Sequence, residues 1–270
     1  WLAGALLGLA GAGAQGLSRN PLADPYLMGS ATGAAFGVAV LLVLTGTSPG
    51  AVTHWMAHVG LAGAGFLGAT SAVLVALVLA RGVEHTLRLL LSGVMVGVVS
   101  GALAALVMFW SPDVLRSMQS FVLGTTSFLG WASVGLLAGI GFASVIVAAA
   151  LSPALDALAL GESTAAGLGV PLQPVRIALV VLVALATGAA VAQVGLIAFI
   201  GLVAPHVVRA AVQPTHRWLL PLSGLAGGVL LLGAGGLSRW LLGPQGLPVG
   251  VLTALLGGGY LLWLMHRRPL

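Results

Sequence analysis

Side chains that could do chemistry are few and far apart in this chain. The five acidic residues all fall in predicted loops or at the ends of apolar spans: Asp24, Glu84, Asp113, Asp156 and Glu162. Ion-coupled carriers and channels usually need carboxylates inside the membrane to bind or relay the ion. An ion-coupled carrier or channel acting alone is kept as an alternative hypothesis for the function. The carboxylates that it would need inside the membrane are missing from the predicted spans.

The histidines also give no clear site. His54 and His58 lie four residues apart and share one helix face, a spacing that some metal sites use. No carboxylate and no third histidine is near them in the sequence, so we expect a pair of boundary residues and leave substrate contact open. His206 follows Pro205, where a single imidazole is more often a local hydrogen-bonding residue than a ligand. We predict no catalytic residue, no metal site and no cofactor.

Two residue types are absent. The chain has no cysteine, which excludes thiol catalysis and thiolate metal sites, and no lysine, so all ten basic residues are arginines. The phosphate-binding loop of nucleotide hydrolases requires a lysine, so any ATP hydrolysis must take place in another chain. The net charge of +5 comes from arginines that stand singly or in pairs between apolar blocks. This pattern is typical of a topology signal rather than of nucleic-acid binding.

The composition predicts an all-α polytopic membrane protein. Of the 270 residues, 59% are hydrophobic and 6% charged, and the mean hydropathy is +1.14. Apolar blocks of the length that crosses a bilayer as helix are expected at 1–17, 27–45, 56–80, 87–110, 131–151, 175–197, 218–237 and 248–265. Residues 113–130 are amphipathic and predict a surface or re-entrant helix. Residues 195–209 predict a brief ninth crossing, or a broken helix that its neighbours must cover.

Arginine positions predict the orientation. When the C-terminal residues 266–268 are placed in the cytoplasm, eight of the ten arginines fall on that side, provided that residues 195–209 cross. Only Arg116 and Arg239 fall outside. Pairs of glycines four residues apart, such as Gly4 and Gly8, line single helix faces and predict close helix packing.

Two loops on the predicted cytoplasmic side have a defined character. Pro21 and Pro25 stop the first span, while Asn20 and Asp24 can hydrogen-bond the freed backbone. Residues 152–175 form the least apolar stretch, in which we expect two short helices, one from Ser152 and Pro153 and one from Glu162. Such a rigid projection fits a docking surface for a motor subunit, and the residues alone fit an ordinary loop equally well.

Five strings occur in an order that resembles the FecCD-type permease family, which imports iron-siderophores, haem or cobalamin. They are residues 15–25, 88–93, 158–170, 195–209 and 247–255. The resemblance covers nearly the whole chain. It implies the type II ABC importer permease fold, formed by a single transmembrane permease domain over residues 1–270 with a cytoplasmic coupling-helix loop at 152–175. About nine transmembrane helices of the expected ten are present, the first being absent at the N-terminus.

The resemblance also implies partners. They are a second permease copy, in a homodimer or with a close paralogue, a cytoplasmic pair of ATPase subunits and an external substrate-binding protein. The expected location is the cytoplasmic (inner) membrane of a bacterium or archaeon, and the expected mechanism is alternating access. The family carries several chelates on one scaffold, so the substrate is not predicted further.

Roles are carried over by position from the family motifs. The implied inner gate comprises Asn20, Leu22, Thr86 and Leu87. The implied ATPase-coupling residues are Asp156, Leu160, Gly161, Glu162, Ser163, Ala165, Ala166 and Leu168. Arg239 is the implied contact for the binding protein, although Gly235 and Gly236 stand where the family commonly has an acid.

Overall fold

A computed structural model describes residues 1–45, 55–80, 86–126, 129–242 and 247–267. Within these ranges every regular element is a helix. The order is α1 (Leu2–Ser18), η1 (Pro25–Met28), α2 (Ser30–Thr45), α3 (Trp55–Leu79), α4 (Thr86–Trp110), α5 (Pro112–Leu123), α6 (Trp131–Ala159), α7 (Glu162–Gly167), α8 (Leu172–Val194), α9 (Ile200–Val212), α10 (His216–Leu242) and α11 (Val249–Arg267).

The apolar helices account for the predicted spans. In the described part of the chain, five helices are long and apolar enough to cross a membrane: α3, α4, α6, α8 and α10. Four shorter apolar helices, α1, α2, α9 and α11, bring the total to nine. The prediction of an all-α polytopic fold is confirmed.

Helix α1 lies at the centre of one group of helices. It packs against α6, α8, α9 and α10, and 14 of its 17 residues are buried. Gly8 faces the backbone carbonyl of Ser223 on α10, and Gly11 faces the backbone of Gly201 on α9. A methyl group at either glycine would collide with backbone, so the close packing predicted from the glycine spacing is confirmed.

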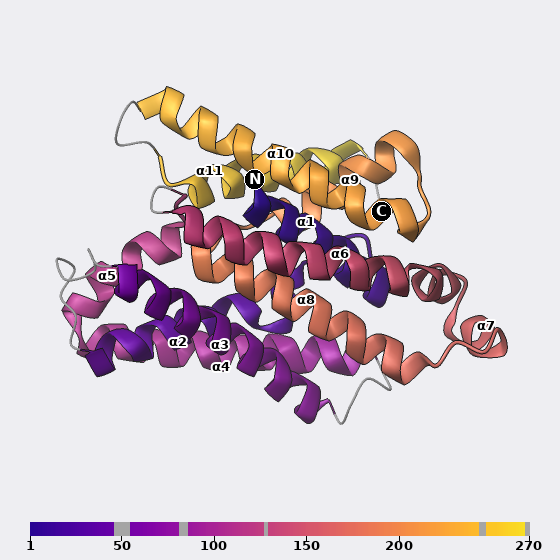
Figure 1. The fold of residues 1–270 in the computed structure, drawn as a ribbon, viewed down its shortest axis with the longest axis horizontal. Helices are drawn as coiled ribbons and strands as arrows, with labels where there is room; N and C mark the ends of the chain where they lie inside the picture. Colours follow the sequence, from indigo (N-terminus) through magenta and orange to yellow (C-terminus); the bar gives the residue numbers. More distant parts are fainter. Residues whose placement is uncertain (46–54, 81–85, 127–128, 243–246, 268–270) are drawn as a thin grey trace.

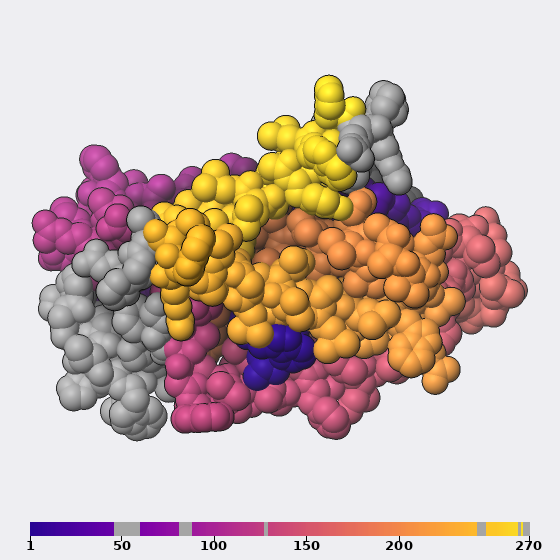
Figure 2. All heavy atoms as spheres, turned by 90° about the horizontal axis from the view of Figure 1, so that it is seen from above, coloured from indigo at the N-terminus to yellow at the C-terminus, as the bar shows by residue number. Residues whose placement is uncertain are grey.

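Helices α2, α3 and α4 form a second group. Gly33 and Gly37 of α2 lie directly against Gly68 of α3, where small residues again let two backbones approach. The two groups are joined mainly by α3 packing on α8 (Figure 1). Helix α11 lies at the margin of the molecule, against α9 and α10 (Figure 2).

Helix α6 is longer than the sequence predicted. We expected a span ending at residue 151 and a separate short helix from Ser152, but α6 continues through Pro153 to Ala159. Proline leaves the carbonyl four residues earlier without its usual N–H donor. The Ser152 hydroxyl donates a hydrogen bond of 2.8 Å to that carbonyl, which belongs to Ala149. The serine thus replaces the missing donor, and the helix continues.

The segment between α8 and α9 is irregular and covered, as predicted. Leu196 N donates to the Phe121 carbonyl at 3.0 Å, and the Tyr26 hydroxyl donates to the Ile197 carbonyl at 2.9 Å. Its polar backbone is therefore paired by α5 and η1 rather than left to face lipid. Helix α9 then runs back toward the side from which α8 came.

The bundle has two distinct ends (Figure 1). At one end, here called the α7 end, α7 lies near the last residues of α1 and α6 and the first of α8 and α10; at the opposite, α5 end, lies the amphipathic α5. Arg19, Arg176 and Arg217 belong to helix termini at the α7 end, and Arg116 belongs to α5. Arg239 lies 23 residues along α10 from His216, about 35 Å at the helical rise. This separation is close to the thickness of a bilayer, and it divides these five arginines as the sequence predicted.

Candidate functional site

Helix α7 is a six-residue helix that projects from one end of the molecule (Figures 1 and 2). Gly161, before it, has φ 114°, and Gly169, after it, has φ 80°. Side-chain-bearing residues rarely adopt these angles, so glycines are required where the chain turns into and out of α7. The turns set α7 apart as a short projection between α6 and α8.

One face of the projection is open. The docking face, as we name it, consists of Leu160, Ser163, Ala166 and Leu168, all of them exposed. The two leucines are 69% and 65% exposed. Exposed leucines at a helix end outside the apolar spans are typical of a surface that a partner covers.

The other predicted coupling residues point elsewhere. Ala165 is fully buried, with 0% exposure, so it packs α7 onto the bundle and does not lie on the docking face. Asp156 near the end of α6 accepts a 2.9 Å hydrogen bond from the backbone N–H of His216, the first residue of α10. Its Oδ1 also lies 2.6 Å from the His216 Nδ1. Asp156 therefore binds the end of α6 to the start of α10.

Glu162 is the centre of an ion cluster at the base of α7. Its Oε1 lies 2.7 Å from Nη2 of Arg176 at the start of α8 and 3.0 Å from Nη2 of Arg19 just after α1. The Arg176 side chain is only 5% exposed, whereas those of Glu162 and Arg19 are 37% and 44% exposed. One carboxylate thus joins α7 to two transmembrane helices.

The predicted turn after α1 is present. The Asn20 side chain accepts a 2.9 Å hydrogen bond from Leu22 N, and the Asp24 side chain accepts one of 2.8 Å from Tyr26 N. Burial raises the pKa of the Asp24 carboxyl, and the bond from Tyr26 partly offsets that rise. Asn20 and Leu22 are both exposed, so the gate turn, as we name residues 20–22, faces outward from the bundle at this end.

Four residues of interest lie wholly or partly outside the described part of the structure. Helix α4 begins at Thr86, but the side chains of Thr86 and Leu87, the other two predicted gate residues, lie outside the described part of the structure. His54 and the side chain of His58 also lie outside it.

Several contacts at the α7 end could not be found from spacing alone. Gln15 is 2% exposed in α1; its Nε2 donates to the Leu202 carbonyl at 3.3 Å, and its Oε1 accepts a hydrogen bond from Arg209. These bonds fix α1 to α9. From the sequence, Arg176 and Arg209 were interpreted only as topology signals. Their partners are 14 and 194 residues away in the chain, so no local pattern indicates them.

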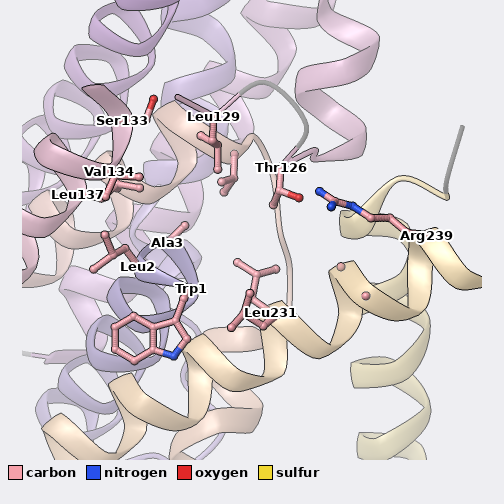
Figure 3. A pocket seen from close by; sticks show the side chains of 14 residues that line it. Trp1, Leu2, Ala3, Thr126, Leu129, Ser133, Val134, Leu137, Leu231 and Arg239 are labelled. Atoms are coloured by element: carbon pink, nitrogen blue, oxygen red, sulfur yellow. The ribbon is translucent and has the colours of Figure 1, made fainter. Parts of the chain in front are cut away.

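A cleft lies at the α5 end, between the start of α1, the start of α6 and the end of α10. It encloses about 520 Å³, and its walls are mainly apolar, formed by residues such as Trp1, Leu137 and Leu231. Arg239 lies at its mouth with the guanidinium directed toward Thr126 (Figure 3). Arg239, the cation predicted to face an external partner, is exposed at this end of the molecule.

Known proteins with the same sequence and fold features are membrane permeases. The chain is 36% identical over 267 residues to the hemin transport system permease HmuU of Yersinia pestis, covering 98% of this chain and 79% of the relative. It is 37% identical to the vitamin B12 import permease BtuC of Vibrio cholerae, covering 98% and 78%. It is 35% identical to the iron(3+)-hydroxamate import permease FhuB of Bacillus subtilis, covering 98% and 68%.

The comparison of folds agrees with the comparison of sequences. A solved inward-facing structure of a metal-chelate type ABC transporter superposes with a TM-score of 0.87 at 27% identity, covering 99% of this chain and 84% of that one. PsaBC of Streptococcus pneumoniae shares the fold at a TM-score of 0.65 and 16% identity. The model of the FecCD transport family matches residues 1–267. Together with the five ordered strings and the helix arrangement, this match makes the chain a member of the FecCD transport family.

Proposed function

We propose that this chain is the permease subunit of an ATP-binding-cassette importer that moves an iron chelate, haem or cobalamin across the cytoplasmic membrane of a bacterium or archaeon. The docking face on α7 carries this proposal. It presents two exposed leucines on a short projection at the arginine-rich end, which the positive-inside bias assigns to the cytoplasm. A cytoplasmic ATPase pair is the partner that this surface fits.

The charge distribution supports an external energy source. The four acidic residues that the structure describes lie at helix ends or between helices, where they accept hydrogen bonds or pair with cations. No carboxylate in the described ranges lies in the middle of an apolar span to bind or relay an ion. The alternative of an ion-coupled carrier or channel therefore has no specific support.

The remaining partners follow from the two ends of the molecule. Arg239 beside the cleft at the α5 end is suited to an acidic residue of an external binding protein, since rim charges orient partners and speed their encounter.

A second permease copy, identical or a close paralogue, would complete the path between two subunits. Hemin, vitamin B12 and iron hydroxamate, for which the relatives are named, are the substrates to test first under this proposal. Transport would proceed by alternating access, as the ATPase pair moves α7.

Replacing the two exposed leucines tests this function. The double variant Leu160→Asp and Leu168→Asp places two charges where an apolar contact is expected, and it should weaken capture of the ATPase subunit about tenfold or more. Co-purification with the tagged ATPase and a binding titration in detergent measure the effect. Uptake of the chelate should be lost in parallel.

The matched control introduces the same change at the other end of the molecule. Leu115 on α5 is 53% exposed, so Leu115→Asp replaces a leucine of similar exposure. It should leave ATPase capture at the wild-type level. Equal capture by the wild type and the α7 double variant would sink the docking assignment.

A further inference from the structure

The ion cluster at the base of α7 assigns different tasks to its two arginines. Resting on the function proposed above, we propose that Arg19 transmits the movement of α7 to the gate turn, while Arg176 holds α7 in place. Both guanidinium groups contact the same Glu162 oxygen, at 3.0 and 2.7 Å. Their surroundings differ, and the difference separates the tasks.

Arg176 has the properties of an anchor. Its side chain is 5% exposed and projects from the start of α8, a helix with 14 buried residues. Loss of a carboxylate partner is costly for a charge in such surroundings, because little water can take its place. The shorter contact, to Arg176, therefore fixes where α7 begins relative to α8.

Arg19 has the properties of a link. It is the residue immediately after α1, with φ 51° and ψ 33°, the left-handed conformation that ends a helix. Its side chain is 44% exposed, and the next residue, Asn20, is the first of the gate turn. The side chain points to α7, while its backbone continues into the gate.

Of the two segments on either side of Arg19, the gate turn can move more easily than α1. Upstream of Arg19, Gln15 is held by Leu202 and Arg209 of α9, and most of α1 is buried. Downstream, the gate turn is exposed and held by the Asn20 side chain on Leu22 N. A displacement of α7 together with the start of α8 carries Glu162 with it, and the exposed gate turn can follow through Arg19 whereas the buried α1 is held. The Arg19–Glu162 pair connects the motor side to the inner gate.

The test compares variants of the complete importer, reconstituted with its ATPase and binding protein. Arg19→Gln should capture the ATPase and hydrolyse ATP as the wild type does, but transport at least fivefold fewer chelate molecules per ATP. Arg19→Lys keeps a cation that can reach Glu162 and should recover most of that ratio. Arg176→Gln should instead weaken ATPase capture, because α7 loses its anchor.

Controls separate this idea from the proposed function. Arg217→Gln removes another arginine at the α7 end, and its transport per ATP should be that of the wild type. An unchanged ratio for Arg19→Gln, or weakened ATPase capture by it, would overturn the transmission role. A wild-type chain that captures no ATPase would instead refute the importer function itself.

A distance measurement gives a second test that needs no substitution of Arg19. Because the chain contains no cysteine, Leu22→Cys and Thr164→Cys in one permease copy can carry spin labels without background labelling. The two labels should keep the same separation in the nucleotide-free and ATP-bound importer, since the gate turn moves with α7. A separation that changes between these states would contradict the link.

Discussion

Acidic side chains at the α7 end hold helices together. Glu162 joins α7 to α1 and α8, and Asp156 joins α6 to α10. Asp24 orders the chain before η1 by accepting the Tyr26 N–H. A protein with so few charged residues thus uses Glu162 and Asp156 to join helices and Asp24 to order the backbone before η1.

Loss of the Asp156 carboxylate should destabilise the bundle. Asp156→Ala leaves the His216 backbone N–H and ring without their acceptor, which should lower the free energy of unfolding by about 1–3 kcal/mol. Thermal unfolding in detergent measures this loss. Asp113→Ala is the control, because that carboxylate is 75% exposed and lies 4.0 Å from Arg116. Equal transition temperatures for Asp156→Ala and the wild type would show that the contact contributes nothing.

Reversal of the charge at Arg239 should act only on the external partner. Arg239→Glu places a carboxylate where an acidic residue of the binding protein is expected, so docking should weaken at least tenfold, mostly through slower association. Surface plasmon resonance with the loaded binding protein provides the rates. Arg116→Glu, an exposed arginine of the same end, is the comparison. The role would be refuted by matching affinities for Arg239→Glu and the wild type.

At the scale of the helices, glycine contacts determine which pairs pack closely. The Gly11 position on α1 meets the backbone of Gly201 on α9, which cannot move aside as a side chain can. Gly11→Ala should therefore cost about 1–3 kcal/mol of stability through overpacking. Gly139→Ala on α6 has nothing within 4 Å and should be neutral or slightly stabilising. The yield of monodisperse protein after heating compares the two variants. A Gly11→Ala protein as heat-resistant as Gly139→Ala would contradict the close contact.

The positions of most helices could be predicted from the sequence. Hydrophobic blocks predicted eight of the nine apolar helices, because a bilayer requires long apolar segments whatever their neighbours are, and for residues 195–209 they left a brief crossing and a broken helix open. The proline-rich turn with Asn20 and Asp24 was also predictable, since Asx turns are local.

The remainder depends on side-chain contacts and burial that the sequence pattern does not reveal. Ser152 and Pro153 predicted the start of a separate short helix, and only the Ser152 bond to Ala149 explains why α6 continues through them. Among the coupling residues, the sequence could not separate the exposed Leu160 from the buried Ala165, because a six-residue helix has too little periodicity to reveal its inner face. The partnership of Glu162 with Arg176 required the packed structure.

At the scale of the whole molecule, the account predicts a fixed orientation in the membrane. Single cysteines can be introduced without background in this cysteine-free chain. Ser163→Cys on α7 should react with a membrane-impermeant maleimide only from the cytoplasmic side, and Gln119→Cys on α5 only from outside. Labelling of intact cells and of inside-out vesicles distinguishes the two sides. Reaction of both positions from one side would show that α5 and α7 do not lie on opposite faces.

The two ends also divide the work of the proposed importer. The α7 end carries the docking face, the ion cluster and the gate turn, while the α5 end carries Arg239 and its cleft. The bundle between them supplies apolar helices and, in its described part, no buried carboxylate within a span. In the proposed importer the chain would be the conduit and the transmission, and ATP hydrolysis and substrate selection would belong to its partners.

The most direct test is the energy source for uptake in proteoliposomes that contain this chain, its ATPase and its binding protein. The substrate should be offered in turn as a radiolabelled ferric siderophore, haem and cobalamin, with ATP inside, with a non-hydrolysable analogue, or with only a proton or sodium gradient. The account predicts accumulation of at least one of the three with ATP alone. Accumulation driven by an ion gradient without ATP would contradict it.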